Sequence, residues 1–147
     1  MDSILASLPL FGIGGSIVPF LSKYAIIRAC GSVERSIKKI IYDKAAASTT
    51  IETKKYLENT IIESSMNPSL YNIRKLLNKF GDEWSSEFNS RMSSITKKEQ
   101  DSLQSLVDLR NEFAHGGNPT ATASNIREYF EDSIKIVELL DNIISAQ

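Results

Sequence analysis

The sequence contains one cysteine and one histidine in 147 residues, so the side chains that form disulfides and hold most protein metals are nearly absent. A single cysteine cannot form an intramolecular disulfide. One Cys with one His cannot supply four zinc ligands without carboxylates or a second chain. Cys30 is therefore expected to be a buried apolar residue in a reducing compartment, the cytoplasm. No metal or other cofactor is expected.

The chain also lacks an excess of positive charge. Its 17 Lys and Arg residues stand against 18 Asp and Glu residues, which gives a formal net charge of −1. Domains held on nucleic acid by bulk electrostatics usually carry a clear basic excess, so this mode of binding is disfavoured, whereas a local phosphate site stays open. Most of the lysines occur in pairs, and solvated surface is the default interpretation of such pairs.

No charged residue occurs between Asp2 and Lys23, and an uncharged stretch of this length raises the question of a membrane span. Two prolines interrupt a helix there, and no Lys or Arg precedes the apolar part as in a signal peptide. Neither a membrane span nor a secretory leader is therefore expected. Residues 1–20 are interpreted as an apolar segment that packs on the domain or on a partner chain, and residues 21–147 as a single helical domain.

Glycine and proline are few, and no run alternates apolar and polar residues for long enough to predict a strand. Apolar residues recur instead at three- and four-residue steps, which is the spacing of one helix face. The sequence is therefore predicted to be all-α, an up-and-down bundle of about five helices. The expected helices cover approximately residues 19–46, 49–62, 71–80, 96–114 and 124–144.

Two of these helices begin with a capping-box pattern, in which a Thr is followed three residues later by a Glu. Thr49 with Glu52 predicts one start, and Thr96 with Glu99 predicts the other. The helix from Thr96 ends at a Gly-Gly pair, a stop signal that agrees with its start signal.

The most informative segment is the end of this helix, Leu109 to Gly117, which contains the only histidine. At about 100° per residue, the apolar arc of the helix is centred close to the direction of Arg110. A guanidinium keeps its charge, so Arg110 must reach solvent, pair with a carboxylate or face a cleft that binds an anion. Asn111 and His115 are four residues apart and can converge next to Arg110.

This combination suits phosphodiester chemistry, because Arg can hold nonbridging phosphate oxygens while His moves a proton near neutral pH. RNA supplies its own nucleophile, the 2′-hydroxyl. The alternative is structural: Arg110 pairs with a core carboxylate, and His115 caps the helix through its last carbonyl groups. The residues alone leave both interpretations open.

Residues Arg110 to His115 read R-N-E-F-A-H and are followed by Gly116, which resembles the signature of HEPN domains. In that signature an Arg and a His are a few residues apart, with Asn often following the Arg. The segments Gly31 to Ile37 and Arg74 to Phe88 resemble the RiboL-PSP and related stand-alone HEPN groups. The resemblance covers most of the chain after about Pro19.

The resemblance implies a metal-independent endoribonuclease of a toxin–antitoxin or anti-phage defence system, acting on an RNA substrate. It also implies a homodimer in which two motifs meet, so that two copies of His115 supply the general base and the general acid. Arg110 would stabilise charge on the phosphoryl oxygens, and Asn111 would orient the phosphate or His115. A possible antitoxin or regulatory partner follows from the same resemblance, and the interrupted N-terminal segment predicts no membrane association. The alternative is a non-catalytic HEPN module that dimerises and binds RNA or a partner protein.

Glu34 is the leading candidate for a residue that holds Arg110. It lies toward the edge of the apolar face of its predicted helix, and the resembling families often have an acidic residue there. The alternative is an exposed pair with Lys38, four residues later, worth roughly a few tenths of a kcal/mol. A buried structural pair of Arg110 with Glu34 would make Arg110→Ala cost several kcal/mol.

Overall fold

The computed structural model describes residues 18–146, and every regular element in this part of the chain is helical. The all-α prediction is therefore confirmed. A π-helical turn, η2 (Glu58–Ile62), continues α3, and a short 3₁₀ turn, η3 (Met92–Ser94), follows α5. The α-helices are α2 (Val18–Ala46), α3 (Ile51–Leu57), α4 (Leu70–Asn78), α5 (Asp82–Arg91), α6 (Lys97–Ala114) and α7 (Ala123–Ser145).

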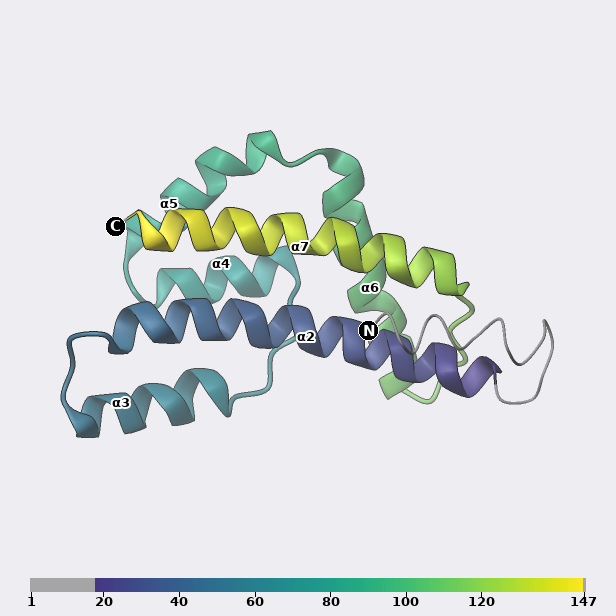
Figure 1. Ribbon diagram of the computed structural model, residues 1–147, viewed down its shortest axis with the longest axis horizontal. Coiled ribbons are helices and arrows are strands. Elements are labelled where there is room, and N and C mark those ends of the chain that lie inside the picture. Colours follow the sequence, from purple (N-terminus) through teal and green to yellow (C-terminus); the bar gives the residue numbers. More distant parts are fainter. Residues whose placement is uncertain (1–17, 147) are drawn as a thin grey trace.

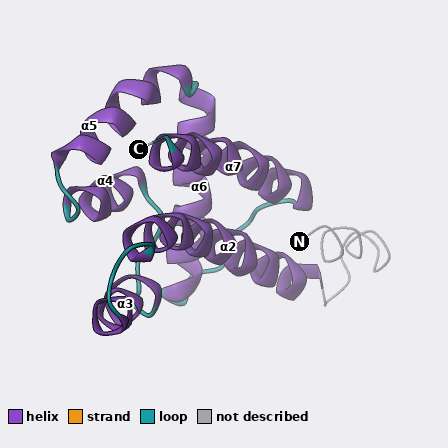
Figure 2. Cartoon of the chain, turned by 60° about the vertical axis from the view of Figure 1, so that its left-hand side comes forward, coloured by secondary structure: helices purple, strands orange, loops and turns teal. Residues whose placement is uncertain are grey.

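The two longest helices, α2 and α7, lie side by side, and α6 packs against both of them (Figure 1). In both views α2 has α3 on one side and α7 with α5 on the other (Figures 1 and 2). The chain between η2 and α4 thus passes from one side of α2 to the other (Figure 1).

The core is formed by the predicted apolar faces of α2, α6 and α7, with contributions from α4 and α5. Burial of these faces removes apolar surface from water, which is the main favourable contribution to folding. Cys30 is 2% exposed, as its interpretation as a buried apolar residue requires. The largest fully buried side chains include Ile26, Ile37 and Ile41 of α2, Leu103 and Leu106 of α6, Ile126 and Leu140 of α7, Ile73 and Leu77 of α4, and Phe88 of α5.

Two aromatic residues of the predicted helical repeats do not enter the core. Tyr56 is 67% exposed and Tyr71 is 71% exposed. Tyr56 stays exposed because α3 has no buried residue of its own. The contact with α2 is made by Leu57 at the end of α3 and by Ile61 of η2. Ala114 follows the apolar spacing of α6 but is also exposed, because the last turn of the helix extends beyond the core.

The predicted capping box at Thr49 is wrong by one residue. Thr50 is the N-cap of α3, and its hydroxyl accepts a hydrogen bond from the Thr53 amide at 3.3 Å. The Thr49 hydroxyl instead donates to the carbonyl of Ala46 at 3.2 Å and so belongs to the end of α2.

The apolar segment 1–20 lies almost wholly outside the described residues, which begin at Val18. Its packing on the domain or on a partner therefore stays a prediction. Within residues 18–146, no helix combines the length and the apolar character that crossing a membrane requires.

Candidate functional site

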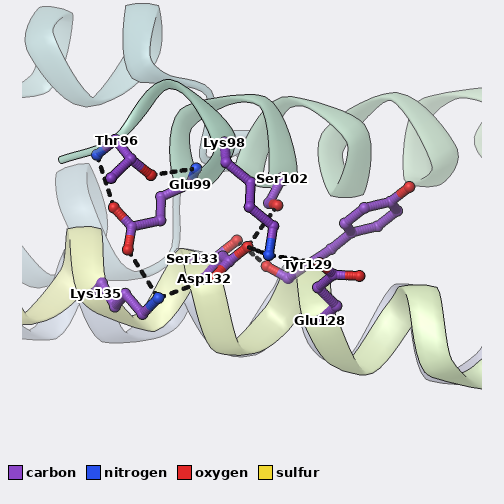
Figure 3. A network of polar contacts seen from close by, with 9 residues as sticks. All are labelled: Thr96, Lys98, Glu99, Ser102, Glu128, Tyr129, Asp132, Ser133 and Lys135. Carbon is purple, nitrogen blue, oxygen red and sulfur yellow. Dashed lines mark hydrogen bonds and ion pairs between the residues drawn. The ribbon is translucent and has the colours of Figure 1, made fainter.

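The motif lies on α6, and the N-terminal end of this helix is capped as predicted. The Thr96 hydroxyl accepts from the Glu99 amide at 3.2 Å, and the Glu99 carboxylate accepts from the Thr96 amide at 2.7 Å. The same carboxylate pairs with Lys135 of α7 at 2.8 Å (Figure 3). The cap thus also joins α6 to its neighbour.

A buried carboxylate strengthens this connection. Asp132 of α7 is 5% exposed and accepts hydrogen bonds from the Ser102 hydroxyl at 2.8 Å and from Lys135 at 3.0 Å (Figure 3). Lys98 of α6 lies 3.9 Å from Asp132 and pairs with Glu128 at 2.7 Å. Because buried polar groups are costly unless they are paired, this network fixes the position of α6 against α7.

The network predicts a loss of stability in acid. The hydrogen bond from Lys135, together with that from the Thr96 amide, lowers the pKa of Glu99 from 4.5 to about 2. Burial raises the pKa of Asp132, but hydrogen bonds from Ser102 and Lys135 outweigh burial and leave the pKa below its ordinary value. Both carboxylates therefore stabilise the fold above their unfolded-state pKa values, and this contribution is lost as pH falls toward the folded-state values.

We expect the melting temperature of the wild-type protein to decrease between pH 4.5 and about 2, the interval given by the pKa of Glu99. Thermal unfolding followed by circular dichroism at a series of pH values measures this decrease. A Glu99→Gln/Asp132→Asn variant should be less stable at neutral pH and show a flatter pH profile. Parallel profiles for the two proteins would contradict the assignment of acid sensitivity to this network.

At its C-terminal end, α6 stops in a Schellman motif. The Gly116 amide donates to the Phe113 carbonyl at 3.0 Å, and the Gly117 amide donates to the Glu112 carbonyl at 2.8 Å. Gly116 has φ +81°, a left-handed conformation that L side chains rarely adopt. His115 is the C-cap residue, and its side chain is exposed at this fixed end of the helix.

Among the three motif residues, the side chains of Arg110 and Asn111 are in contact, and His115 is joined to Asn111 by a backbone bond of the helix. The Arg110 Nη1 atom donates to Asn111 Oδ1 at 3.2 Å, and the His115 backbone amide donates to the Asn111 carbonyl at 3.0 Å. At about 100° per residue, Asn111 lies between Arg110 and His115 around the helix axis. Arg110 and Asn111 are half-buried. The helix end therefore presents a guanidinium, an amide and an imidazole on adjoining parts of one surface.

The N-terminal half of α2 flanks this surface. The Lys23 Nζ atom lies 5.8 Å from the centre of the Phe113 ring and 5.9 Å from that of Phe20, both within the range of cation–π attraction. Burial raises the pKa of the Cys30 thiol to about 11, and the positive charge of Arg110 opposes this rise.

The carboxylate of Glu34 is held by Lys38, and the expected pair with Arg110 is not among the contacts of the described residues. Glu34 Oε1 accepts from Lys38 Nζ and from the Met66 amide, the latter at 3.2 Å. Lys38 also donates to the Ser64 carbonyl. The Lys38 and Glu34 side chains are 6% and 21% exposed, so the pair is largely buried and not the exposed pair considered as the alternative.

A second apolar stripe on α2 was not predicted from the sequence. Phe20, Tyr24 and Ile27 are 69%, 49% and 40% exposed. Their four- and three-residue spacing is visible in the sequence, but the neighbouring stripe through Ile26 and Cys30 has the same spacing and forms the core. Periodicity alone cannot tell which of two adjacent stripes is buried.

The chain matches the RiboL-PSP-HEPN family model over residues 4–146. The matched range includes all the described helices and most of the apolar N-terminal segment. No curated protein and no solved structure gives a significant match. A match over nearly the whole chain, with the motif at the end of α6 of a helical bundle, establishes that the protein belongs to the RiboL-PSP-HEPN family.

Proposed function

We propose that the protein is a metal-independent HEPN endoribonuclease that acts in the cytoplasm, as part of a toxin–antitoxin or anti-phage defence system. The observation that carries the proposal is the arrangement of Arg110, Asn111 and His115 at the capped end of α6. The histidine side chain is exposed, and the guanidinium is oriented by the neighbouring amide. A guanidinium binds phosphate oxygens well, and an imidazole exchanges protons near neutral pH.

The reaction requires only these groups and the RNA. The 2′-oxygen attacks the adjacent phosphorus while the bond from phosphorus to the 5′-oxygen of the next nucleotide breaks. One His115 takes the proton of the 2′-hydroxyl, and a second gives a proton to the departing 5′-oxygen. Arg110 stabilises the charge that develops on the nonbridging oxygens. The products are a 2′,3′-cyclic phosphate and a free 5′-hydroxyl.

The need for two histidines makes a homodimer part of the proposal, because each chain has one. HEPN domains generally dimerise. The exposed stripe of Phe20, Tyr24 and Ile27 is the described apolar surface next to the motif, and Lys23 connects it to Phe113 of α6. A second copy seated on this stripe would bury apolar area and bring the two motifs together around one phosphate.

Incubation of the purified protein with mixed cellular RNA in excess chelator tests the proposal. The expected result is cleavage that leaves cyclic phosphate and 5′-hydroxyl ends. Cleavage that requires added metal, or that leaves 5′-phosphates, would contradict the mechanism. RNA that is bound but stays intact would favour the non-catalytic module, with an antitoxin or another regulatory protein as its partner.

A further inference from the structure

Two hollows adjoin where the chain leaves η2. The larger, of about 740 Å³, lies between α2 and η2, and the smaller, of about 270 Å³, lies between the end of η2 and α4. Ser64 and Ser65 line both hollows, so the two lie on either side of this segment. Gly31, Glu34 and Lys38 line the larger hollow on the side of α2. The two hollows therefore lie along the segment that joins η2 to α4.

The charges around the larger hollow compensate one another. Four of its six charged lining residues belong to ion pairs. The other two, Arg35 and Glu63, have opposite signs. This hollow therefore offers room without a net attraction for anions. The compensating pairs are Lys38 with Glu34, Lys39 with Asp43, and Lys55 with Glu58.

The smaller hollow has a different composition. Lys75 of α4 and Lys79, the C-cap residue of this helix, both line it, and no carboxylate among the described residues does. Both lysines are exposed and can reach a ligand in the hollow. The rest of its polar lining is neutral, with the hydroxyl and amide side chains of Thr60, Ser64, Ser65, Asn67 and Asn72. Of these, the Ser64 hydroxyl donates to the Ile61 carbonyl and the Asn72 amide donates to Asn67.

The wall between the hollows is held in place. Lys38 donates to the Ser64 carbonyl, and Glu34 accepts from the Met66 amide, so one buried ion pair fixes this segment on both sides of residue 65. The Asn72 side chain donates to Asn67 Oδ1 at 2.6 Å and to the Asn67 carbonyl at 3.1 Å. A fixed wall lowers the entropic cost of binding a ligand against it.

We propose that the smaller hollow binds the phosphodiester backbone of the RNA strand that flanks the cleaved bond. From there the strand continues past Ser64 and Ser65 to the larger hollow beside α2. Lys75 and Lys79 contact phosphate oxygens. The inference rests on the proposed function, because it takes RNA as the ligand. It adds a binding site, on α4 and the segment before it, that is separate from the motif.

The test measures binding of a single-stranded RNA oligonucleotide by fluorescence anisotropy at several salt concentrations, with His115→Ala protein so that cleavage does not interfere. In this background, Lys75→Gln/Lys79→Gln should weaken binding. Each lost phosphate contact on single strands reduces the slope of log affinity against log salt by about 0.7, so the double change should reduce it by about 1.4. The matched control is Lys54→Gln/Lys97→Gln, which removes the same charge from exposed sites that line neither hollow.

The outcomes separate this inference from the proposed function. A lower slope for the Lys75/Lys79 variant and an unchanged slope for the control support the binding site, whether or not the wild-type protein cleaves RNA. Equal slopes for both variants overturn the site on α4 and leave cleavage at Arg110 and His115 unaffected. Failure of every protein to bind RNA overturns both. Because all four positions are exposed, thermal unfolding should show intact folds throughout.

Discussion

Replacing His115 by alanine is expected to reduce the rate of RNA cleavage by about 100- to 10,000-fold, the usual contribution of a general acid or base. His115 supplies the only imidazole of the chain, and Asn111 and Arg110 cannot exchange protons in its place near neutral pH. The rate is measured on a labelled RNA with excess chelator and saturating enzyme, so that the change reports the chemical step.

This substitution should leave the fold intact. The His115 side chain is exposed, and alanine retains the backbone amide that donates to the Asn111 carbonyl. Asn118→Ala, at an exposed position just beyond the motif, is the control and should keep the wild-type rate. Equal cleavage by wild-type and His115→Ala protein would identify the activity as a contaminant.

Arg110→Ala is expected to lower the cleavage rate by about 100- to 1,000-fold, as the loss of one preorganised donor to a charged transition state does elsewhere. The same variant should change the free energy of unfolding by less than about 1 kcal/mol, because its described hydrogen bond joins it to the adjacent Asn111. Urea denaturation and the cleavage assay on the same preparation measure the two effects.

Lys38→Ala is the contrasting variant. It removes the cation from a largely buried pair and leaves Glu34 without its charged partner, so we expect a loss of about 3 kcal/mol. If Arg110→Ala is destabilised to a similar extent, the arginine has a structural role. An unchanged stability with a strongly reduced rate supports the catalytic one.

Most of the fold could be predicted because the relevant information is local. The capping box at Thr96 and the glycines after His115 define α6 through contacts within a few residues. The start of α3 was misplaced because Thr49 with Glu52 fits the capping-box pattern, whereas the actual N-cap, Thr50, is followed three residues later by Thr53. Which of them caps depends on where α2 ends, since the hydroxyl of Thr49 bonds to Ala46.

The candidate site could be predicted only in part. The motif residues follow one another on one helix, so their proximity needs no tertiary information. Lys38 was the alternative partner considered for Glu34, but the burial of this pair could not be predicted, because it depends on how the segment after η2 packs on α2. The convergence of the lysines of α4 with Ser64 and Ser65 likewise depends on how the chain passes α2 after η2.

The central claim is that two copies of the motif form one RNA-cleaving site, and a mixed dimer tests it most directly. Differently tagged wild-type and His115→Ala chains are coexpressed, the heterodimer is isolated through both tags, and its cleavage rate is compared with that of the wild-type homodimer in excess chelator. If one His115 acts as base and the other as acid, the heterodimer should retain less than about a tenth of the wild-type rate. Half of the wild-type rate would mean that each chain cleaves RNA independently and would contradict the composite site.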